Sequence, residues 1–306
     1  MAGTPISEPR PAAGRVRPKV VYVMGSGRSG STILGVALGN CESVFYAGEL
    51  DNWLTRSGVP SLGGVERTRF WSAVREGVAG AAELFGSEAQ RTLERSFAPF
   101  RIHKWGAQRR LRPRYRRVTE DLYHAIARVA QATHVVDTSH FPLRARELQE
   151  LDGIDLHLVF LIRNPQSVVA SFNLYVNRND TAERRLRMLS TNANLWLTHL
   201  LSVLVFLRHP RDRRMLLRYE DFLADPGGML QHILDRVDSP ATLPELASLR
   251  TGLPLHGNRL IGSEVVTLKS QTFTPPRGSL MTTLLQLPWT AVFSRLRPVA
   301  SASVSR

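Results

Sequence analysis

One stretch near the N-terminus constrains the fold more than any other part of the chain. It reads VVYVMGSGRSGSTIL, from Val20 to Leu34. Its first five residues are apolar and rich in valine, which predicts a short buried strand over Val20–Met24. A glycine-rich turn follows, and a helix is predicted over Ser31–Gly39. A strand, a glycine-rich turn and a helix in this order expose backbone N–H groups at a helix N-terminus, so the stretch predicts an α/β fold with an anion-binding loop.

The loop departs from the one that binds ATP or GTP. That loop has the pattern G-x-x-x-x-G-K-[ST], and here Gly25 and Gly30 keep the glycine spacing while Thr32 keeps the hydroxyl. Ser31 stands where the lysine is required, and Arg28 places a cation inside the loop instead. The missing lysine normally reaches the β and γ phosphates beside a magnesium ion. The sequence therefore favours a terminal phosphate group held without a metal, and we expect no metal site.

Strands and helices alternate along the rest of the chain. Further strands are predicted at Thr133–Val136, Leu156–Ile162 and Arg214–Tyr219, a strand or loop at Cys41–Tyr46, and helices over Pro165–Tyr175 and Gly227–Val237. This alternation predicts a three-layer, P-loop-like α/β fold in which helices flank a mostly parallel sheet. Helical signals dominate residues 65–132 and 180–206, and we expect these two helical insertions to form the substrate-side walls.

A second pattern suited to an anion follows the clearest buried strand, Leu156–Ile162. Arg163 comes directly after this strand, Pro165 opens the next helix, and Ser171 lies eight residues beyond the arginine. An arginine at the carboxyl end of a strand and a serine two turns into the following helix can converge on one phosphate group. The sequence therefore predicts two anion sites, one after each of two buried strands.

Together the two stretches resemble the sulfotransferases that use 3′-phosphoadenosine 5′-phosphosulfate (PAPS). The glycine-rich loop is similar to the motif that binds the 5′-phosphosulfate in that family. Arg163-Asn164-Pro165 with Ser171 is similar to the motif that binds the 3′-phosphate. The resemblance implies a PAPS-dependent enzyme that moves a sulfonate group to a hydroxyl of a glycan, lipid or small metabolite. The residues it assigns to the donor are Gly27, Arg28, Ser29, Gly30, Ser31, Thr32, Arg163 and Ser171.

The resemblance extends from about Val20 to Lys269. LLRYEDFLADP (Leu216–Pro226) and HGNR (His256–Arg259) are similar to segments of bacterial and carbohydrate-type members. The K-G-x-x-G-x-W-K loop of the cytosolic aryl and steroid enzymes is absent, and Ile261 stands where a second arginine is expected after Gly-Asn. The way in which those enzymes close over the nucleotide therefore does not transfer to this chain.

Sulfonate transfer to a hydroxyl needs a base that takes the proton and a cation that stabilises the leaving phosphate. Arg28 is the candidate for the cation. Glu49, in FYAGELDNW, resembles the base of tyrosylprotein and several carbohydrate sulfotransferases. His140, in DTSHFPLRA, resembles the histidine base of the cytosolic enzymes. We favour Glu49 as the base and His140 as a support for the sulfonate. An alternative role for Asp137 is to orient His140.

The domain organisation is predicted to be simple. One α/β domain over residues 18–292 is expected between a disordered tail, 1–17, and a loose C-terminal tail, 293–306. The single cysteine, Cys41, excludes a disulfide framework and a cysteine-based zinc site. The first residues lack the apolar core of a signal peptide. Together with the single cysteine, this favours a cytoplasmic location. The apolar run Leu195–Leu207 is predicted to be a buried helix and not a membrane span.

The formal net charge of +14 indicates anionic partners. Arg101–Arg117, with Trp105 and Tyr115, fits either a basic wall for an acidic or glycan acceptor or a solvated helix face. Nucleic acid is not favoured as a partner, because it leaves both anion motifs without a purpose. The alternative functions are a P-loop kinase or NTPase, supported only by Asp137 after a strand, and a non-catalytic nucleotide-binding module. Neither the acceptor nor the oligomeric state follows from the sequence.

Overall fold

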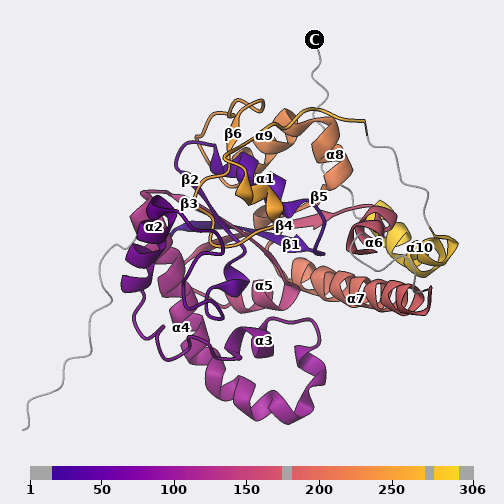
Figure 1. The fold of residues 1–306 in the computed structure, drawn as a ribbon, viewed down its shortest axis with the longest axis horizontal. Coiled ribbons are helices and arrows are strands. Elements are labelled where there is room, and N and C mark those ends of the chain that lie inside the picture. Colours follow the sequence, from indigo (N-terminus) through magenta and orange to yellow (C-terminus); the bar gives the residue numbers. More distant parts are fainter. Residues whose placement is uncertain (1–15, 174–180, 273–278, 296–306) are drawn as a thin grey trace, which may run out of the picture.

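The computed structural model describes residues 16–173, 181–272 and 279–295 (Figure 1). Five strands form one sheet in the order β2-β3-β1-β4-β5, and all paired neighbours are parallel. Their bounds are β1 Lys19–Gly25, β2 Val44–Gly48, β3 His134–His140, β4 Asp155–Ile162 and β5 Arg214–Arg218. Two short strands, β6 Leu249–Arg250 and β7 Val265–Val266, form a separate antiparallel pair. The predicted α/β fold with a parallel sheet is confirmed.

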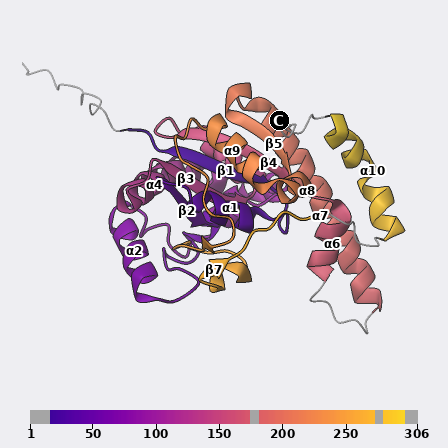
Figure 2. The same ribbon diagram turned by 90° about the horizontal axis from the view of Figure 1, so that it is seen from above.

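Helices cover both faces of the sheet (Figures 1 and 2). One face carries α1 Ser31–Gly39, α8 Tyr219–Ala224 and α9 Pro226–Arg236. The other carries α4 Trp105–Ala130, α5 Pro142–Leu148 and α7 Thr181–Arg208. The remaining helices are α2 Val65–Glu76, α3 Ala89–Leu93, α6 Pro165–Asn173 and α10 Leu280–Arg295.

The central strand β1 shows why the sheet has a core on each side. Val20, Tyr22 and Met24 pack into the core beneath α4 and α5, whereas Val21 and Val23 pack beneath α1 and α9. Successive side chains of a strand point to opposite faces of the sheet. A strand buried on both faces reads as a continuous apolar run, which is the pattern that predicted β1.

The strand order creates a crevice between β1 and β4. After β1 the chain crosses to β2 on one side of the sheet, and after β4 it crosses to β5 on the other. Open α/β sheets bind their ligands at such a divergence, outside the carboxyl ends of the strands. The glycine-rich loop follows β1 and Arg163 follows β4, so this topology brings the two predicted anion motifs to the same place.

The predicted elements are all present, but several bounds differ: β3 runs on to His140, and β2 begins at Val44 and ends at Gly48. The segment predicted to be a strand to Tyr219 ends one residue earlier, and α8 begins there. The loose tail predicted from Phe293 is wrong at its start, because α10 continues to Arg295 and the Phe293 ring packs against Phe160 and His199. The predicted tail residues 1–15 and 296–306, and residues 174–175 of the predicted helix after β4, lie outside the described residues.

The apolar run Leu195–Leu207 lies in α7, and the prediction of a buried helix holds for one face only. Leu195 and Phe206 are buried, whereas Leu204 and Leu207 are 52% exposed. Within the described ranges, one helix is long and apolar enough by length and composition to cross a bilayer, over Arg185–Arg208, and 39% of the apolar window is buried. Core helices of globular proteins pass the same test.

Candidate functional site

Two glycines hold the loop between β1 and α1 against its neighbours. A Cβ atom on Gly25 would lie 2.3 Å from the Leu161 carbonyl oxygen, and one on Gly30 would lie 2.1 Å from the Tyr219 ring. Gly30 also has a φ of 95°, which favours glycine. Sterics therefore require glycine at both positions. The first turn of α1 begins directly after Gly30, and its N–H groups have no intrahelical partners, as anion binding requires.

The hydroxyl groups of the loop are buried rather than solvated. Ser31 and Thr32 are 8% and 3% exposed, and Ser29 is 1% exposed. The Ser29 Oγ has no hydrogen-bond partner among the described residues. A buried polar atom without a partner costs about 1–3 kcal/mol, a cost that a bound oxyanion would remove. Arg28 has a left-handed φ of 66°, and its guanidinium carbon lies 6.0 Å from the centre of the Phe172 ring.

The Arg163 side chain joins the two predicted motifs. Its Nη1 donates to the Arg28 carbonyl oxygen at 2.9 Å, and its guanidinium lies over the Tyr219 ring, 4.7 Å from the ring centre. Its Nε is buried and has no partner in the part of the chain that the structure describes. The Arg163 guanidinium thus faces the glycine-rich loop and keeps a donor for a ligand.

The turn from β4 into α6 is fixed by two further contacts. The Asn164 N–H donates to Glu220 Oε1 at 2.7 Å, and the Ser167 N–H donates to Asn164 Oδ1 at 3.2 Å. The Ser167 Oγ is buried and has no partner among the described contacts, which makes it a candidate that the motif did not include. Ser171 lies one turn further along the same helix face and is half-buried. None of the described contacts joins Ser171 to Arg163.

Glu49 follows β2 directly, and its side chain is 20% exposed. Its N–H donates to the His256 carbonyl oxygen at 2.9 Å, and His256 Nε2 lies 3.7 Å from Glu49 Oε2. Burial and the charge of Asp137 raise the pKa of Glu49 to about 7, although Arg28 and Arg95 oppose the shift. A carboxyl group with a pKa near 7 is suited to act as a general base at neutral pH.

His140 ends β3 beside the loop. A Cβ atom on Gly27 would lie 3.8 Å from His140 Nε2 and 3.3 Å from the Phe172 ring. The backbone of His140 has a left-handed φ of 58°. Burial, and then the charge of Arg95, lowers the pKa of His140 to about 4. The imidazole is therefore neutral at pH 7 and is a weaker base than Glu49.

Asp137 does not have the orienting role that the sequence suggested. Its carboxylate accepts hydrogen bonds from Tyr123 Oη at 2.6 Å, the Ser139 N–H at 2.9 Å and Arg144 Nε at 3.1 Å. These donors use both oxygens of a fully buried side chain. Asp137 is therefore committed to the interior. The strand-end carboxylate that supported the kinase alternative is thus engaged inside the protein.

Arg144 is the centre of this buried network. Its side chain is 1% exposed and contacts Glu94 Oε1 at 2.6 Å, Tyr115 Oη at 3.0 Å and Tyr123 Oη at 3.2 Å, as well as Asp137. Burial raises the pKa of Glu94, and the Arg144 charge opposes this. The network ties β3 to α4 and α5 behind the site. It fixes the strand end that carries His140.

Part of the basic stretch Arg101–Arg117 is engaged within the protein. Arg112 Nε and Arg116 Nε contact the two carboxylate oxygens of Glu147 at 3.0 Å and 2.9 Å, and Arg114 pairs with Glu83. These arginines connect α4 to α5 and to the segment before α3. Their contacts give the stretch a structural role alongside its predicted acceptor role.

A cavity of about 220 Å³ opens beside the glycine-rich loop. Its lining includes Gly27, Arg95, His140, Phe172 and the α7 residues Thr191 and Thr198. The Arg95 guanidinium stacks on the Phe141 ring at 4.2 Å and lies 3.5 Å from Asp51. Sequence reasoning missed Arg95, because it lies in the first helical insertion and no motif marks it.

The family model described as the sulfotransferase family matches residues 18–242. The chain belongs to the sulfotransferase family. The match covers the sheet, the glycine-rich loop, Glu49, His140 and Arg163, and it ends before the His256 segment that lies against Glu49.

Solved structures agree with this sulfotransferase at the level of the fold. The sulfotransferase domain of the curacin biosynthetic pathway is 16% identical with a TM-score of 0.51, over 89% of this chain and 98% of that one. The sulfotransferase domain of the Synechococcus PCC 7002 olefin synthase is 17% identical with a TM-score of 0.52, over 93% and 98%. Sulfotransferase STF9 of Mycobacterium avium is 12% identical with a TM-score of 0.50, over 94% and 79%. The sequence has no significant match among curated proteins.

Proposed function

We propose that this sulfotransferase transfers the sulfonate group of PAPS to a hydroxyl of a glycan, lipid or small metabolite. The observation that carries the proposal is the 2.9 Å contact between Arg163 Nη1 and the Arg28 carbonyl oxygen, which puts both anion motifs on one crevice. PAPS carries an anion at each end, the 5′-phosphosulfate and the 3′-phosphate. The unpartnered Ser29 Oγ, Arg163 Nε and Ser167 Oγ are buried donors that suit these anions.

The proposal gives each group one task. The loop Gly27–Thr32 with Arg28 holds the 5′-phosphosulfate, and Arg163 with Ser171 and Ser167 holds the 3′-phosphate. When bound, PAPS supplies the sulfonate group and a bisphosphate leaving group. The cavity beside His140 and Arg95 receives the acceptor. The single cysteine of the chain is consistent with action in the cytoplasm.

We propose the following chemistry for these groups. Glu49 takes the proton of the acceptor hydroxyl while the acceptor oxygen bonds to sulfur. The bond between sulfur and the phosphate oxygen breaks, and its electron pair leaves with the phosphate. Arg28 stabilises the charge that develops there, and neutral His140 donates a hydrogen bond to the sulfonate. No step in this scheme calls for a metal ion.

Thermal unfolding with nucleotides tests the donor class. Adenosine 3′,5′-bisphosphate with a chelator present is expected to stabilise the protein by about 2.7 kcal/mol at a hundred times its Kd. Mg-ATP is expected to stabilise it less. Stabilisation by Mg-ATP alone would favour the kinase alternative. Transfer is then sought by screening hydroxyl compounds with sulfate-labelled PAPS, and bisphosphate binding without transfer to any acceptor would favour the non-catalytic module.

The 3′-phosphate site is tested separately. Arg163→Ala is expected to weaken adenosine 3′,5′-bisphosphate about 10–100-fold, since a hydrogen bond to a charged group contributes about 1.5–3 kcal/mol. Adenosine 5′-phosphate, which lacks the 3′ group, should lose much less affinity. Calorimetric titration measures both ligands, with Arg218→Ala, an exposed arginine at the end of β5, as the control. Equal losses for the two ligands would remove Arg163 from the 3′ site.

A further inference from the structure

Helix α10 buries Trp289 together with polar residues and presents leucines to solvent. Thr282 and Gln286 are 0% and 1% exposed, whereas Leu280, Leu284 and Leu287 are 74%, 62% and 59% exposed. On the buried side, Gln286 Nε2 donates to the Asn192 side-chain oxygen of α7 at 3.0 Å, whereas Gln286 Oε1 has no partner among the described residues. A helix on the surface of a water-soluble domain normally has the opposite arrangement.

Helix α7 also presents leucines to solvent, although Leu195, Val205 and Phe206 are buried on its inner side. Its buried positions include Asn192, Thr198, His199 and Ser202. Its exposed apolar residues recur at helical spacing, and they are Leu186, Leu189, Leu200, Leu204 and Leu207. The opposite face of the same helix lines the acceptor cavity with Thr191 and Thr198. The leucines therefore lie on the side that faces away from the domain.

The two helices lie side by side at one end of the molecule (Figures 1 and 2). Trp196 Nε1 of α7 donates to the Leu285 carbonyl oxygen of α10 at 2.9 Å, and the Trp196 and Trp289 rings are 4.9 Å apart. We call the five exposed leucines of α7 listed above, together with Leu280, Leu284 and Leu287 of α10, the leucine surface. An exposed apolar patch on two adjacent elements marks an interaction site.

The distribution of charge indicates what covers the leucine surface. The sequence has no Asp, Glu, Lys or Arg from residue 188 to 207, or from 278 to 294. The charges at the ends of both segments are all basic: Arg187 and Arg208 for α7, and Arg277 and Arg295 for α10. Helices that pair in water usually carry charges of both signs beside the apolar seam. Among the described residues, Arg187, Arg208 and Arg295 stand at the ends of the uncharged segments.

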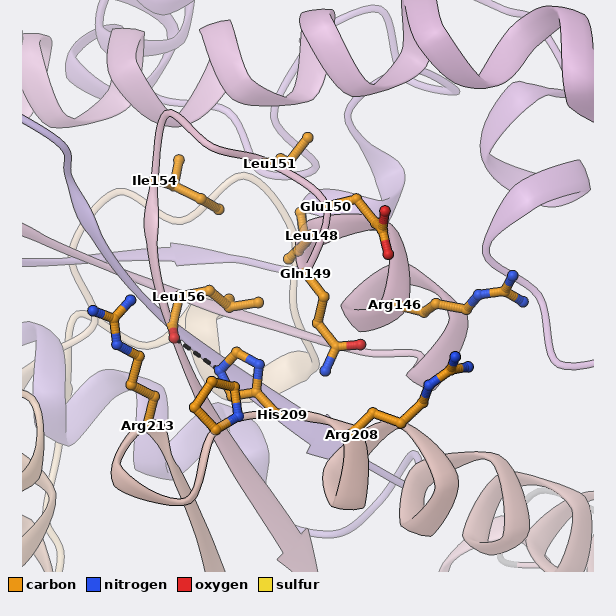
Figure 3. A pocket seen from close by; sticks show the side chains of 11 residues that line it. Arg146, Leu148, Gln149, Glu150, Leu151, Ile154, Leu156, Arg208, His209 and Arg213 are labelled. Carbon is orange, nitrogen blue, oxygen red and sulfur yellow. Dashed lines mark hydrogen bonds between the residues drawn. The ribbon is translucent and has the colours of Figure 1, made fainter.

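A basic cavity continues this pattern at the C-terminal end of α7. It has a volume of about 370 Å³ and is lined by Arg146, Arg208 and Arg213, with Glu150 as its acidic residue. Figure 3 shows the Arg146 and Arg208 side chains, from α5 and α7, extending from the cavity in the same direction. Arg213 is held by Asp155 at 2.6 Å. Arg208 directly follows Leu207 and is the arginine placed to contact phosphate groups next to the leucines, and Arg146 lines the same cavity.

We propose that the leucine surface docks this protein on an anionic lipid bilayer, with the leucines among the acyl chains and the flanking arginines at the phosphate groups. The buried apolar area and the attraction of arginines to anionic lipid both contribute to the free energy of such binding. In this arrangement the two helices lie in the membrane interface and do not span the bilayer, because the other side of each helix packs against its neighbour or the domain. This inference is independent of the identity of the sulfonate donor.

Vesicle sedimentation of the full-length protein tests the proposal. Binding is expected to vesicles of phosphatidylcholine with phosphatidylglycerol, to be weaker with phosphatidylcholine alone, and to fall as salt rises. The triple variant Leu204→Gln/Leu284→Gln/Leu287→Gln should bind about a thousandfold more weakly, from roughly tenfold for each leucine removed from the acyl layer.

The matched control removes three exposed apolar residues elsewhere, with Val59→Gln/Val65→Gln/Leu243→Gln. It should bind vesicles like the wild type, and light scattering should find the wild type monomeric. Wild-type protein that stays in solution with anionic vesicles overturns the proposal, as does a triple variant that binds unchanged. A dimer that the leucine variant converts to monomer, without vesicle binding, would assign the surface to a second copy of the chain instead.

Discussion

Replacing Glu49 by glutamine is expected to lower kcat for sulfonate transfer by about 10²–10⁴-fold, the usual contribution of a general base. Glutamine keeps the shape of the side chain but cannot accept the proton. The loop and Arg163 are unchanged, so the Kd of adenosine 3′,5′-bisphosphate should stay within about threefold of wild type. Steady-state rates with the acceptor found by screening measure the first effect, and calorimetry measures the second.

The pH profile ties this effect to the Glu49 carboxyl itself. Its pKa of about 7 predicts that wild-type kcat/KM rises with pH through about 7, and that the rise is lost in Glu49→Gln. His140→Ala should lower kcat/KM less than Glu49→Gln does. It should also keep the rise of kcat/KM with pH, because the pKa of His140 is near 4. A larger loss in His140→Ala, or an unchanged pH profile in Glu49→Gln, would reverse the two roles.

Stability gives an independent signature of the same group. Burial and Asp137 raise the Glu49 pKa from 4.5 to about 7, so the folded protein holds this proton after the unfolded chain has lost it. The free energy of unfolding of the wild type should therefore fall by roughly 3 kcal/mol, through this group, as the pH rises from about 4.5 to 7. Glu49→Gln should escape that loss and be the more stable protein at pH 8.

Replacing Arg144 by methionine is expected to lower the free energy of unfolding by about 3–5 kcal/mol. The change leaves the Glu94 and Asp137 carboxyl groups buried without their cation, and Tyr115 and Tyr123 each lose a donor. Domains are typically stable by only about 5–15 kcal/mol, so the variant should approach the limit of folding. Urea denaturation measures the difference.

Arg146→Met provides the matched control in the same helix. Arg146 is exposed, and the change should alter the free energy of unfolding by less than about 0.5 kcal/mol. Equal effects of the two substitutions would mean that the buried network does not support the fold in the way that its contacts indicate.

The parts of the site that could be predicted from the sequence are those fixed by local pattern and topology. The apolar run before Gly25 and the run before Arg163 each predict a strand, and parallel strands place their carboxyl ends together. The contact between Arg163 and the Arg28 carbonyl oxygen follows from that arrangement. Glu49 could be proposed because FYAGELDNW resembles the segment that carries the base in tyrosylprotein and several carbohydrate sulfotransferases.

The parts that could not be predicted depend on contacts between distant segments. Arg144 and Glu94 are 50 residues apart in sequence, and nothing near either residue announces the partner. Arg95 reaches the cavity from an insertion whose packing has no sequence pattern of its own. The exposed side of α7 was missed because the run Leu195–Leu207 is largely apolar on every side, so hydrophobic periodicity could not choose between its faces.

Tyr219 lies between the two motifs, with its ring against Gly30 on one side and the Arg163 guanidinium on the other. Aromatic rings are rigid, so the spacing between the glycine turn and the guanidinium is set by a planar group and not by a flexible chain. In the proposed complex, selection then depends on how far apart two negative groups lie in a single molecule. Common mononucleotides carry all their phosphates at one end. They have the negative charge that the two motifs attract, but they do not have a second negative group at the distance of the second motif.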